Sequence, residues 1–364
     1  MCSCGEFEII IMNYKLFKNK KIIVTGFNGF KGAWLSIWLS HLGAKLYGIS
    51  LKNKDKNNHF NLVRDKINLK EFYLDIRDRK KLDQTIKKIK PDFVFHLAAQ
   101  SIVYKSITKP TFNWETNVIG FLNVLLSLSN LKKKCVAVMV TSDKCYKNLE
   151  RAKGYSENDI LGGEDPYSAS KASSEILFNS FFKTYILNKN PFLRVATARA
   201  GNVIGGGDWT EKRLIPDCMK KWLYNKRVII RKPHATRPWQ HVLEALNGYL
   251  ILASKMSKDP KLNGQSFNFS SNKIRNESVI KFLNKIKIVW PSIRWKIVKE
   301  KNFHETKLLQ LNNSKAKKIL KWTAKLNLNQ TIKFLVDWYK HFKKNKKLTY
   351  KISLDQIKLF QKKN

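Results

Sequence analysis

Acidic residues are scarce in this chain: 27 Asp and Glu stand against 70 Lys and Arg, a formal net charge of +43. Such an excess is typical of nucleic-acid-binding proteins, because clustered cations release counterions from phosphates. The lysines, however, are spread along the whole chain among Asn and Ile, as in coding sequence biased toward A and T. We therefore favour a lysine-rich composition over nucleic-acid binding, and interpret the densest run, 340–347, as a solvated end able at most to rest on an anionic surface.

Paired cysteines and long apolar runs are also missing. The five cysteines form no C-x-x-C pair and no zinc spacing, so we expect no metal site and reduced thiols in a cytoplasmic protein. No apolar run is long enough to span a bilayer. The segment 7–12 contains three consecutive isoleucines, but Glu8 lies beside them and no basic residue precedes them, which makes a poor signal peptide. Residues 1–13 are therefore expected to be a disordered extension.

The first half of the chain alternates apolar strand patterns with helical patterns. We expect strands at 21–25, 45–50, 70–74, 92–97, 135–141 and 192–198, and helices at about 31–42, 78–89, 111–130 and 166–187. This rhythm predicts an α/β fold, a Rossmann-like doubly wound parallel sheet with helices on both faces. By the switch-point rule, a ligand would bind at the carboxyl ends of the strands.

The second half is less regular. Gly205-Gly206-Gly207 marks a loop, and prolines at 216, 233 and 238 mark further turns. With 364 residues and 43% hydrophobic content, a large domain plus a smaller one is the natural partition. We expect a nucleotide-binding domain at 14–202 with a return segment at 239–257, a smaller mixed α/β substrate-binding domain at 203–350, and a basic tail at 351–364.

A glycine-rich turn follows the first strand. Lys21–Thr25 is a short apolar run, the turn Gly26-x-x-Gly29-x-x-Gly32 comes next, and a helical pattern with Trp34 and Leu35 follows. Strand, glycine turn and helix are the context that a dinucleotide-binding loop requires, since the glycines let backbone amides at the helix N-terminus approach a pyrophosphate. We favour a dinucleotide-binding loop over a glycine turn that binds no ligand.

Two short segments carry the candidate chemistry. Tyr167 and Lys171 are four residues apart, which places them on one face of a helix that Pro166 would begin. A nearby ammonium and a nicotinamide cation both stabilise a phenolate, so Tyr167 would act as a base near neutral pH. The other segment, Ser142-Asp143-Lys144, ends an apolar strand and adds a hydroxyl, an acid and a second base. A plain alcohol dehydrogenase needs no such extra pair, whereas an enzyme that also eliminates water does. The alternative is a surface Asp-Lys pair, which we consider the less favoured interpretation.

Together these motifs resemble those of the extended short-chain dehydrogenase/reductase family, the NAD-dependent epimerases and dehydratases. The resemblance covers residues from about 20 to at least 345. Within the family, several stretches are most similar to nucleotide-sugar 4,6-dehydratases that act on CDP-glucose. These stretches are 30–35 (FKGAWL), 141–146 (TSDKCY), 162–167 (GGEDPY), 199–209 (RAGNVIGGGDW) and 237–242 (RPWQHV).

The resemblance implies an internal redox elimination that returns its cofactor unchanged. Tyr167, supported by Lys171, would take the proton of the sugar C4 hydroxyl, and Ser142 would orient that oxygen. Lys144 would remove the C5 proton, and a protonated Asp143 would donate to the departing C6 hydroxyl. The product would be CDP-4-keto-6-deoxyglucose, a precursor of deoxysugars in surface polysaccharides such as lipopolysaccharide O-antigen.

The resemblance also implies a set of binding residues. The cofactor would be NAD, with NADP open because Lys52 and no acidic residue follows the second strand. The resemblance also implies a homodimer, built from the helices around 111–130 and 166–187, or a tetramer. Cofactor-binding positions are Gly26, Asn28, Gly29, Phe30, Lys31, Gly32, Asp75, Ile76, Leu97, Ala98, Ala99, Asn117, Tyr167 and Lys171. Substrate-binding positions are Gln100, Arg199, Asn202, Arg213 and Arg237.

Other functions stay open at this point. A dehydratase or 4-epimerase acting on a UDP-, dTDP- or GDP-sugar would share the fold and the Tyr/Lys pair. An epimerase would lack the acid/base dipeptide, and dTDP-glucose dehydratases usually carry Asp-Glu where this chain has Asp143-Lys144. A third class is a non-catalytic nucleotide- or nucleic-acid-binding protein on a Rossmann scaffold; the intact Ser142, Tyr167 and Lys171 set argues against it.

Overall fold

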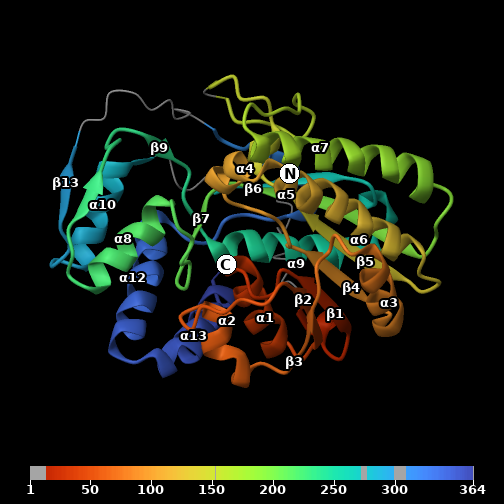
Figure 1. Cartoon of the computed structure of the whole chain (residues 1–364), viewed down its shortest axis with the longest axis horizontal. Coiled ribbons are helices and arrows are strands. Elements are labelled where there is room, and N and C mark those ends of the chain that lie inside the picture. Colours follow the sequence, from red (N-terminus) through yellow and green to blue (C-terminus); the bar gives the residue numbers. More distant parts are fainter. Residues whose placement is uncertain (1–13, 152, 272–276, 299–308, 364) are drawn as a thin grey trace, which may run out of the picture.

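A seven-stranded, entirely parallel sheet organises the chain (Figure 1). The computed structural model describes residues 14–151, 153–271, 277–298 and 309–363, so the expected extension at 1–13 lies outside the described residues. The strand order is β11-β6-β5-β4-β1-β2-β3. The chain adds β2 and β3 on one side of β1 and then β4, β5 and β6 on its other side, so the order of addition reverses between β1 and β4. The sheet comprises β1 (Lys21–Thr25), β2 (Lys45–Ser50), β3 (Leu69–Tyr73), β4 (Phe93–His96), β5 (Cys135–Val140), β6 (Leu193–Ala200) and β11 (Ser266–Phe269).

Helices cover both faces of the sheet, as the sequence predicts (Figure 1). Alternation along β1 explains the two layers: Ile22 and Val24 point into one apolar core, and Ile23 points into the other. One core is covered by α3, α6 and α7, and the other by α1, α9, α12 and α13. The helices are α1 (Phe30–His41), α2 (His59–Val63), α3 (Arg79–Ile89), α4 (Val103–Thr108), α5 (Pro110–Trp114), α6 (Gly120–Ser129), α7 (Pro166–Phe181), α8 (Leu214–Leu223), α9 (Val242–Lys258), α10 (Val279–Val289), α11 (Ser314–Leu320), α12 (Leu328–Lys344) and α13 (Thr349–Gln361).

Short helical turns complete the two long helices that the sequence predicts. A π-helical turn, η3 (Glu115–Ile119), joins α5 to α6, and a second, η5 (Phe182–Ile186), extends α7. Together they account for the helical patterns expected at 111–130 and 166–187. Short 3₁₀ turns are η1 (Tyr14–Phe17), η2 (Arg64–Lys66), η4 (Asp143–Cys145), η6 (Pro260–Leu262) and η7 (Lys346–Leu348).

The second half of the chain contributes to both lobes. Its short strand pairs form the smaller lobe together with α8 and α10 (Figure 1). The expected return segment is present as α9, which packs on β5 and β6. A further strand from this half, β11, pairs with β6 at the edge of the main sheet, and the sequence reasoning did not foresee it. The paired strands are β7 (Val203–Ile204) with β10 (Gln240–His241), β9 (Thr236–Arg237) with β12 (Glu277–Ser278), and β8 (Val228–Ile230) with β13 (Trp295–Ile297).

The segment expected as a basic tail, 351–364, is instead helix α13 over Thr349–Gln361. Ile357 and Phe360 are completely buried, and the ring of Phe360 meets Trp38 of α1 edge-on at 5.7 Å between centroids. Beside the lysines on its outer face, this helix has an apolar stripe, which packs against α1, α2 and α12. In the described part of the chain, no helix combines the length and apolarity needed to cross a membrane.

Candidate active site

The glycine turn between β1 and α1 is built for close backbone packing. Gly26 has a φ of +69°, and a Cβ there would lie 2.8 Å from the backbone nitrogen of Ala98. A Cβ on Gly32 would lie only 2.1 Å from the carbonyl oxygen of Gly26. Gly29 is the N-cap of α1 and provides no side-chain cap, so the first amides of this helix are left for another acceptor. The turn therefore fits a dinucleotide pyrophosphate, which backbone amides and the helix dipole would hold.

Asn28 is committed to the protein itself. Its amide donates to the carbonyl of Leu51 at 2.7 Å and accepts from the Ser50 hydroxyl at 2.6 Å, which ties the glycine turn to the end of β2. Asp75 at the end of β3 accepts from the backbone and guanidinium of Arg77, and these bonds hold its pKa below the usual value despite burial. Both residues lie beside the expected cofactor edge, with Asn28 acting through the loop backbone.

The loop after β4 is held by Asn117, which lies in the π-helical turn η3. Its side chain accepts from the backbone of Gln100 at 2.8 Å and donates to the hydroxyl of Ser170 in α7 at 2.9 Å. The side chain of Gln100 is occupied by the backbone of Ile102. Leu97 and Ala98 lie against the glycine turn at Gly26, and Ala99 follows them before Gln100. Asn117 thus fixes the β4 loop and α7 relative to each other.

Shortly after β5, Ser142 caps the turn η4, whose first two residues are Asp143 and Lys144. The hydroxyl of Ser142 donates to the Asp143 carboxyl at 2.9 Å, and it also accepts from the backbone of Lys144. Asp143 is buried, and burial raises the pKa of its carboxyl. A carboxyl whose pKa is raised is better suited to donate a proton.

Helix α7 carries Tyr167 and Lys171 to this turn. Asp165 caps the helix by accepting from the backbone of Ser168, and Pro166 occupies its first turn, as the sequence predicts. Burial raises the pKa of Tyr167, while a hydrogen bond with Ser142 lowers it. Burial lowers the pKa of Lys171 to about 8. The structure therefore brings the five expected catalytic residues, from two separate segments, into one cluster.

Lys31 and Tyr249 complete this cluster, and Tyr249 is a residue that the sequence reasoning missed. The amine of Lys31, in the first turn of α1, donates to the Tyr249 hydroxyl on α9 at 3.2 Å. The pKa of Lys31 is lowered to about 8, mainly by burial. The nearby charge of Asp143 raises this pKa, and that of Lys171 lowers it. The Lys31 side chain thus extends toward the acid rather than toward the backbone amides of its own helix. Tyr249 lies within a helix of ordinary apolar periodicity, so no motif could have indicated it.

The expected substrate-binding residues separate in the structure. Arg213 precedes α8 and donates to the carbonyl of Ser101 at 3.0 Å. Its positive charge lowers the pKa of both Lys31 and Tyr167. Asn202 is exposed beside Gly201, whose Cβ would lie 3.2 Å from the Asp143 carboxyl. Arg237 lies in β9, and its side chain is outside the described part of the chain.

Arg199 corrects the sequence-based assignment. It was expected to contact the substrate, but its guanidinium is buried and bonds Glu175 at 2.7 Å and the Tyr146 hydroxyl at 2.6 Å. An inward-facing position on β6, the strand next to the edge strand β11, places it behind the Ser142–Cys145 turn. No substrate contact is available to it there.

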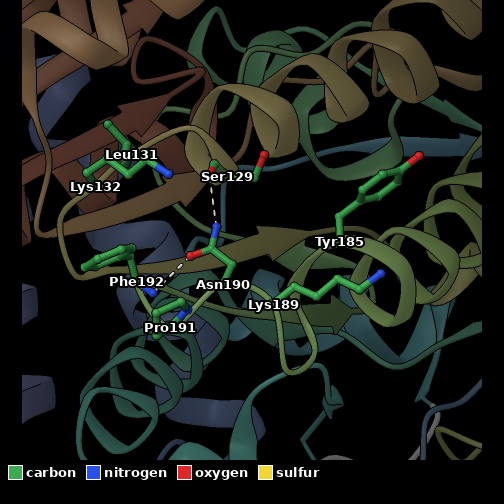
Figure 2. A pocket seen from close by; sticks show the side chains of 8 residues that line it. All are labelled: Ser129, Leu131, Lys132, Tyr185, Lys189, Asn190, Pro191 and Phe192. Carbon is green, nitrogen blue, oxygen red and sulfur yellow. Dashed lines mark hydrogen bonds between the residues drawn. The ribbon is translucent and has the colours of Figure 1, made fainter.

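A surface pocket lies at the other end of the sheet (Figure 2). It is formed where β5 and β6 begin, and Asn190 bridges it by donating to the carbonyl of Ser129 at 2.9 Å. Since the candidate catalytic residues follow the opposite, carboxyl end of β5, this pocket has no part in their chemistry. Its lining residues are Ser129, Leu131, Lys132, Tyr185, Lys189, Asn190, Pro191 and Phe192. Among the described residues there is also no group of three His, Cys, Asp or Glu side chains placed to hold a metal.

The fold and this cluster define the class of protein. Residues 23–335 match the family model described as GDP-mannose 4,6 dehydratase. The chain belongs to this family of NAD-dependent epimerases and dehydratases.

One relative is similar over nearly the whole chain. The chain is 37% identical over 334 residues to CDP-glucose 4,6-dehydratase of Salmonella typhimurium, covering 91% of this chain and 93% of the relative. Two solved structures share the fold. An epimerase of Methanothermobacter thermautotrophicus has a TM-score of 0.79 at 21% identity, covering 95% of this chain and 98% of its own. A dTDP-glucose 4,6-dehydratase of Bacillus anthracis, solved in complex with NAD, has a TM-score of 0.73 at 22% identity, covering 92% and 99%.

Proposed function

We propose that this protein is a nucleotide-sugar 4,6-dehydratase that converts CDP-glucose to CDP-4-keto-6-deoxyglucose. The observation that carries the proposal is the Asp143-Lys144 pair, presented shortly after β5 beside Ser142 and the buried Tyr167. A 4-epimerase needs the hydroxyl and the phenol but has no use for the added acid and base. The 37% identity to a CDP-glucose 4,6-dehydratase over 91% of the chain supports the same substrate.

NAD is the proposed cofactor, and the glycine turn supplies the fit. The uncapped start of α1 and the close approach of Gly26 to Ala98 suit a pyrophosphate bound through backbone amides. The residues proposed to surround it are Gly26, Asn28, Gly29, Phe30, Lys31, Gly32, Asp75, Ile76, Leu97, Ala98, Ala99, Asn117, Tyr167 and Lys171. When bound, NAD supplies a reversible hydride acceptor next to the sugar.

The protein side chains would then divide the proton transfers. Tyr167 takes the proton of the C4 hydroxyl while Ser142, already hydrogen-bonded to Tyr167, orients that oxygen. Oxidation at C4 acidifies the C5 proton, and the half-buried Lys144 is proposed to remove it. Asp143, whose pKa is raised by burial, is proposed to donate a proton as the C6 hydroxyl leaves as water.

The smaller lobe is proposed to bind the rest of the substrate. Arg213 and Arg237 are proposed to bind the diphosphate through charge-assisted hydrogen bonds, with Asn202 beside them. Gln100 would take part through its loop, because its own side chain bonds Ile102. As domains, we propose 14–202 with the return helix for the nucleotide and 203–350 for the substrate, with β11 as part of the main sheet.

The assembly and the location belong to the proposal too. Ile119 and Ile176, on η3 and α7, are half or more exposed, and Tyr185 and Leu187 follow along the same long helix. These apolar side chains support pairing of the two long helices in a homodimer or a tetramer. Cys135, Cys145 and Cys218 are unpaired in the described residues, which supports a reducing, cytoplasmic setting.

Incubation of the purified protein with CDP-glucose and NAD⁺ tests the function. We expect a 4-keto sugar, detected by its absorbance in alkali, to accumulate with no net NADH, because the hydride returns to the sugar. Signal with UDP- or dTDP-glucose alone would retain the dehydration and reject CDP-glucose as substrate. Interconversion of C4 epimers with no keto sugar would reject the dehydratase in favour of an epimerase.

A further inference from the structure

Glu175 is a buried carboxylate that the proposed reaction does not use. It lies one helical turn after Lys171 on α7, and its side chain is completely inaccessible to solvent. Arg199 bonds it at 2.7 Å, Thr197 donates to it at 2.9 Å, and Thr141 donates to its other oxygen. Burial alone would raise the pKa of Glu175, but these partners hold it below its usual value, so the carboxylate is charged.

The partners of Glu175 border the catalytic turn on both sides. Thr141, which bonds the carboxylate, directly precedes Ser142. Tyr146, two residues after Lys144, accepts from the Arg199 guanidinium at 2.6 Å and donates to Asn268 of β11 at 2.8 Å. The pair of Glu175 and Arg199 therefore holds the residues before and after the Ser142–Cys145 turn in the same buried network.

Glu175 also sets the charge around Lys171. The pKa of Lys171 is lowered to about 8 because burial outweighs the Glu175 carboxylate, which is the largest influence that raises it. His96, which is buried and neutral beside Thr25, does not change charge near neutral pH. The other titratable or charged groups facing Lys171 and Glu175 are Lys31 from α1, Cys145 from the turn, Tyr167 from α7 and Arg199 from β6.

Stability alone does not account for this arrangement. A buried ion pair costs more desolvation than it regains in many proteins, and apolar replacements of similar volume are often neutral or stabilising. Here the charged pair is joined to strands β5, β6 and β11 and to the helix of the Tyr/Lys pair. Its position behind the turn gives it an effect on both the geometry and the charge of the site.

We infer that the Glu175–Arg199 pair is the positioning element of the active site: it fixes both ends of the Ser142–Cys145 turn and places a carboxylate one helical turn after Lys171. The inference rests on the proposed function for its kinetic consequence. Glu175 and Arg199 touch no reacting atom and act through Thr141, Tyr146 and Lys171. Loss of the Glu175 charge should therefore alter the pH dependence of the reaction, which a purely structural role would leave in place.

Glu175→Gln tests the charge. Since Glu175 raises the pKa of Lys171, its loss lets Lys171 deprotonate at lower pH, and activity that needs the ammonium then ends at lower pH. We expect the alkaline limb of the kcat profile for CDP-glucose to move down by about one pH unit or more. Asp83→Asn is the matched control: it removes the same formal charge from an exposed pair with Lys87 on α3, and the limb should stay in place.

A second variant covers the case in which an unpaired Arg199 prevents folding. Glu175→Gln combined with Arg199→Met removes both charges together, and this neutral core should fold while showing the same displaced limb. A folded variant, single or double, with the wild-type pH profile would overturn the claim that Glu175 raises the pKa of Lys171.

Amide hydrogen exchange tests the positioning without any activity. We expect exchange in 141–147 to be at least about tenfold faster in Glu175→Gln than in the wild type, with 21–32 unchanged. Unchanged exchange in 141–147 would overturn the positioning claim. Because this measurement needs no turnover, a wild type that dehydrates none of the sugars would reject the proposed function while leaving the positioning claim to the exchange result.

Discussion

At the scale of single residues, the site gives two neighbouring side chains opposite surroundings. Asp143 is buried against Ser142 and Gly201, whereas Lys144, the next residue, is only half-buried. Burial raises the pKa of the Asp143 carboxyl, which suits it to donate a proton, and the partial exposure of Lys144 leaves its amine accessible to act as a base. One tight turn at the end of β5 is enough to produce this difference, because adjacent residues in a 3₁₀ turn point about 120° apart.

Lys144→Met should abolish formation of the 4-keto-6-deoxy product while NAD binding stays at the wild-type level. Methionine keeps a side chain of similar length but removes the amine that is proposed to take the C5 proton. We expect a loss of at least about a hundredfold in kcat, the lower end for a general base. Product formation is followed by absorbance in alkali, and NAD binding by calorimetry.

Lys147→Met serves as the control for Lys144, since Lys147 is exposed three residues later. It should retain full activity. Near-normal turnover in Lys144→Met would remove this lysine from the mechanism.

Lys31→Met should shift the pH dependence in the opposite direction to Glu175→Gln. The Lys31 ammonium lowers the pKa of Asp143, so its removal raises that pKa and keeps the carboxyl protonated to higher pH. If Asp143 is the proton donor, the alkaline limb that it controls should move upward. Tyr249→Phe, which removes only the phenol oxygen that Lys31 bonds, is the matched control and should move the limb less. A downward shift in Lys31→Met would contradict the assignment of Asp143 as the acid.

The same lysine predicts a stability effect whose sign follows from linkage. The pKa of Lys31 is about 8 in the folded protein and 10.5 in the unfolded chain, so the unfolded chain holds more protons between these pH values. This lysine's contribution to stability therefore rises with pH over that window, and its burial costs most below pH 8. Lys31→Met should raise Tm at pH 7 by about 2 °C or more, and the gain should shrink toward pH 10. Scanning calorimetry at both pH values would show this; a lower Tm at pH 7 would contradict it.

At the scale of elements, each strand with its own apolar run could be predicted from the sequence. β1 to β6 lie within two residues of their expected positions, because β-branched and aromatic residues gather there without helical periodicity. β11 could not be predicted. It has only four residues, and its place next to β6 depends on a partner about 70 residues earlier in the chain.

The candidate site divides in the same way. The glycine turn, the Ser-Asp-Lys turn and the Tyr/Lys helix are local patterns, and the sequence indicates each of them. Tyr249 and Glu175 enter only through the packing of α9 and α7 against other elements, which no local pattern records. For Arg199 the predicted orientation was wrong. A cation near the end of β6 was expected to face the ligand, but its side chain faces inward to Glu175.

Two glycines of the turn should differ in how strongly a substitution weakens NAD binding. Gly32→Ala should weaken NAD binding by at least about tenfold, because its Cβ would lie 2.1 Å from the Gly26 carbonyl oxygen and force the turn apart. Gly29→Ala should do less damage, since its Cβ would lie 3.2 Å from the same atom. Binding is measured by calorimetry on the purified variants. Equal effects of the two substitutions would show that packing within the turn does not limit NAD binding.

At the scale of the whole molecule, the C-terminal helix joins the end of the chain to its beginning. α13 packs on α1, α2 and α12, so the last described element covers the helix that begins at the glycine turn. His59 of α2 and Trp338 of α12 both bond the hydroxyl of Ser353 in α13, at 3.0 and 2.9 Å. The high lysine content therefore does not mark a detached end: the cations lie on the outer side of a helix whose inner side is part of the main core.

Phe360→Ala tests whether α13 belongs to that core. The ring of Phe360 is completely buried against Trp38, so its removal should lower the free energy of unfolding by about 3–5 kcal/mol. Leu359→Ala removes the neighbouring side chain, which is 54% exposed, and should cost far less. Both are measured by urea unfolding.

If α13 also supports the glycine turn through α1, the Phe360 variant should lose NAD affinity, and the Leu359 variant should keep it. Equal stability of the two variants would mean that this helix is an appendage, and the turn would then owe its shape to the sheet alone.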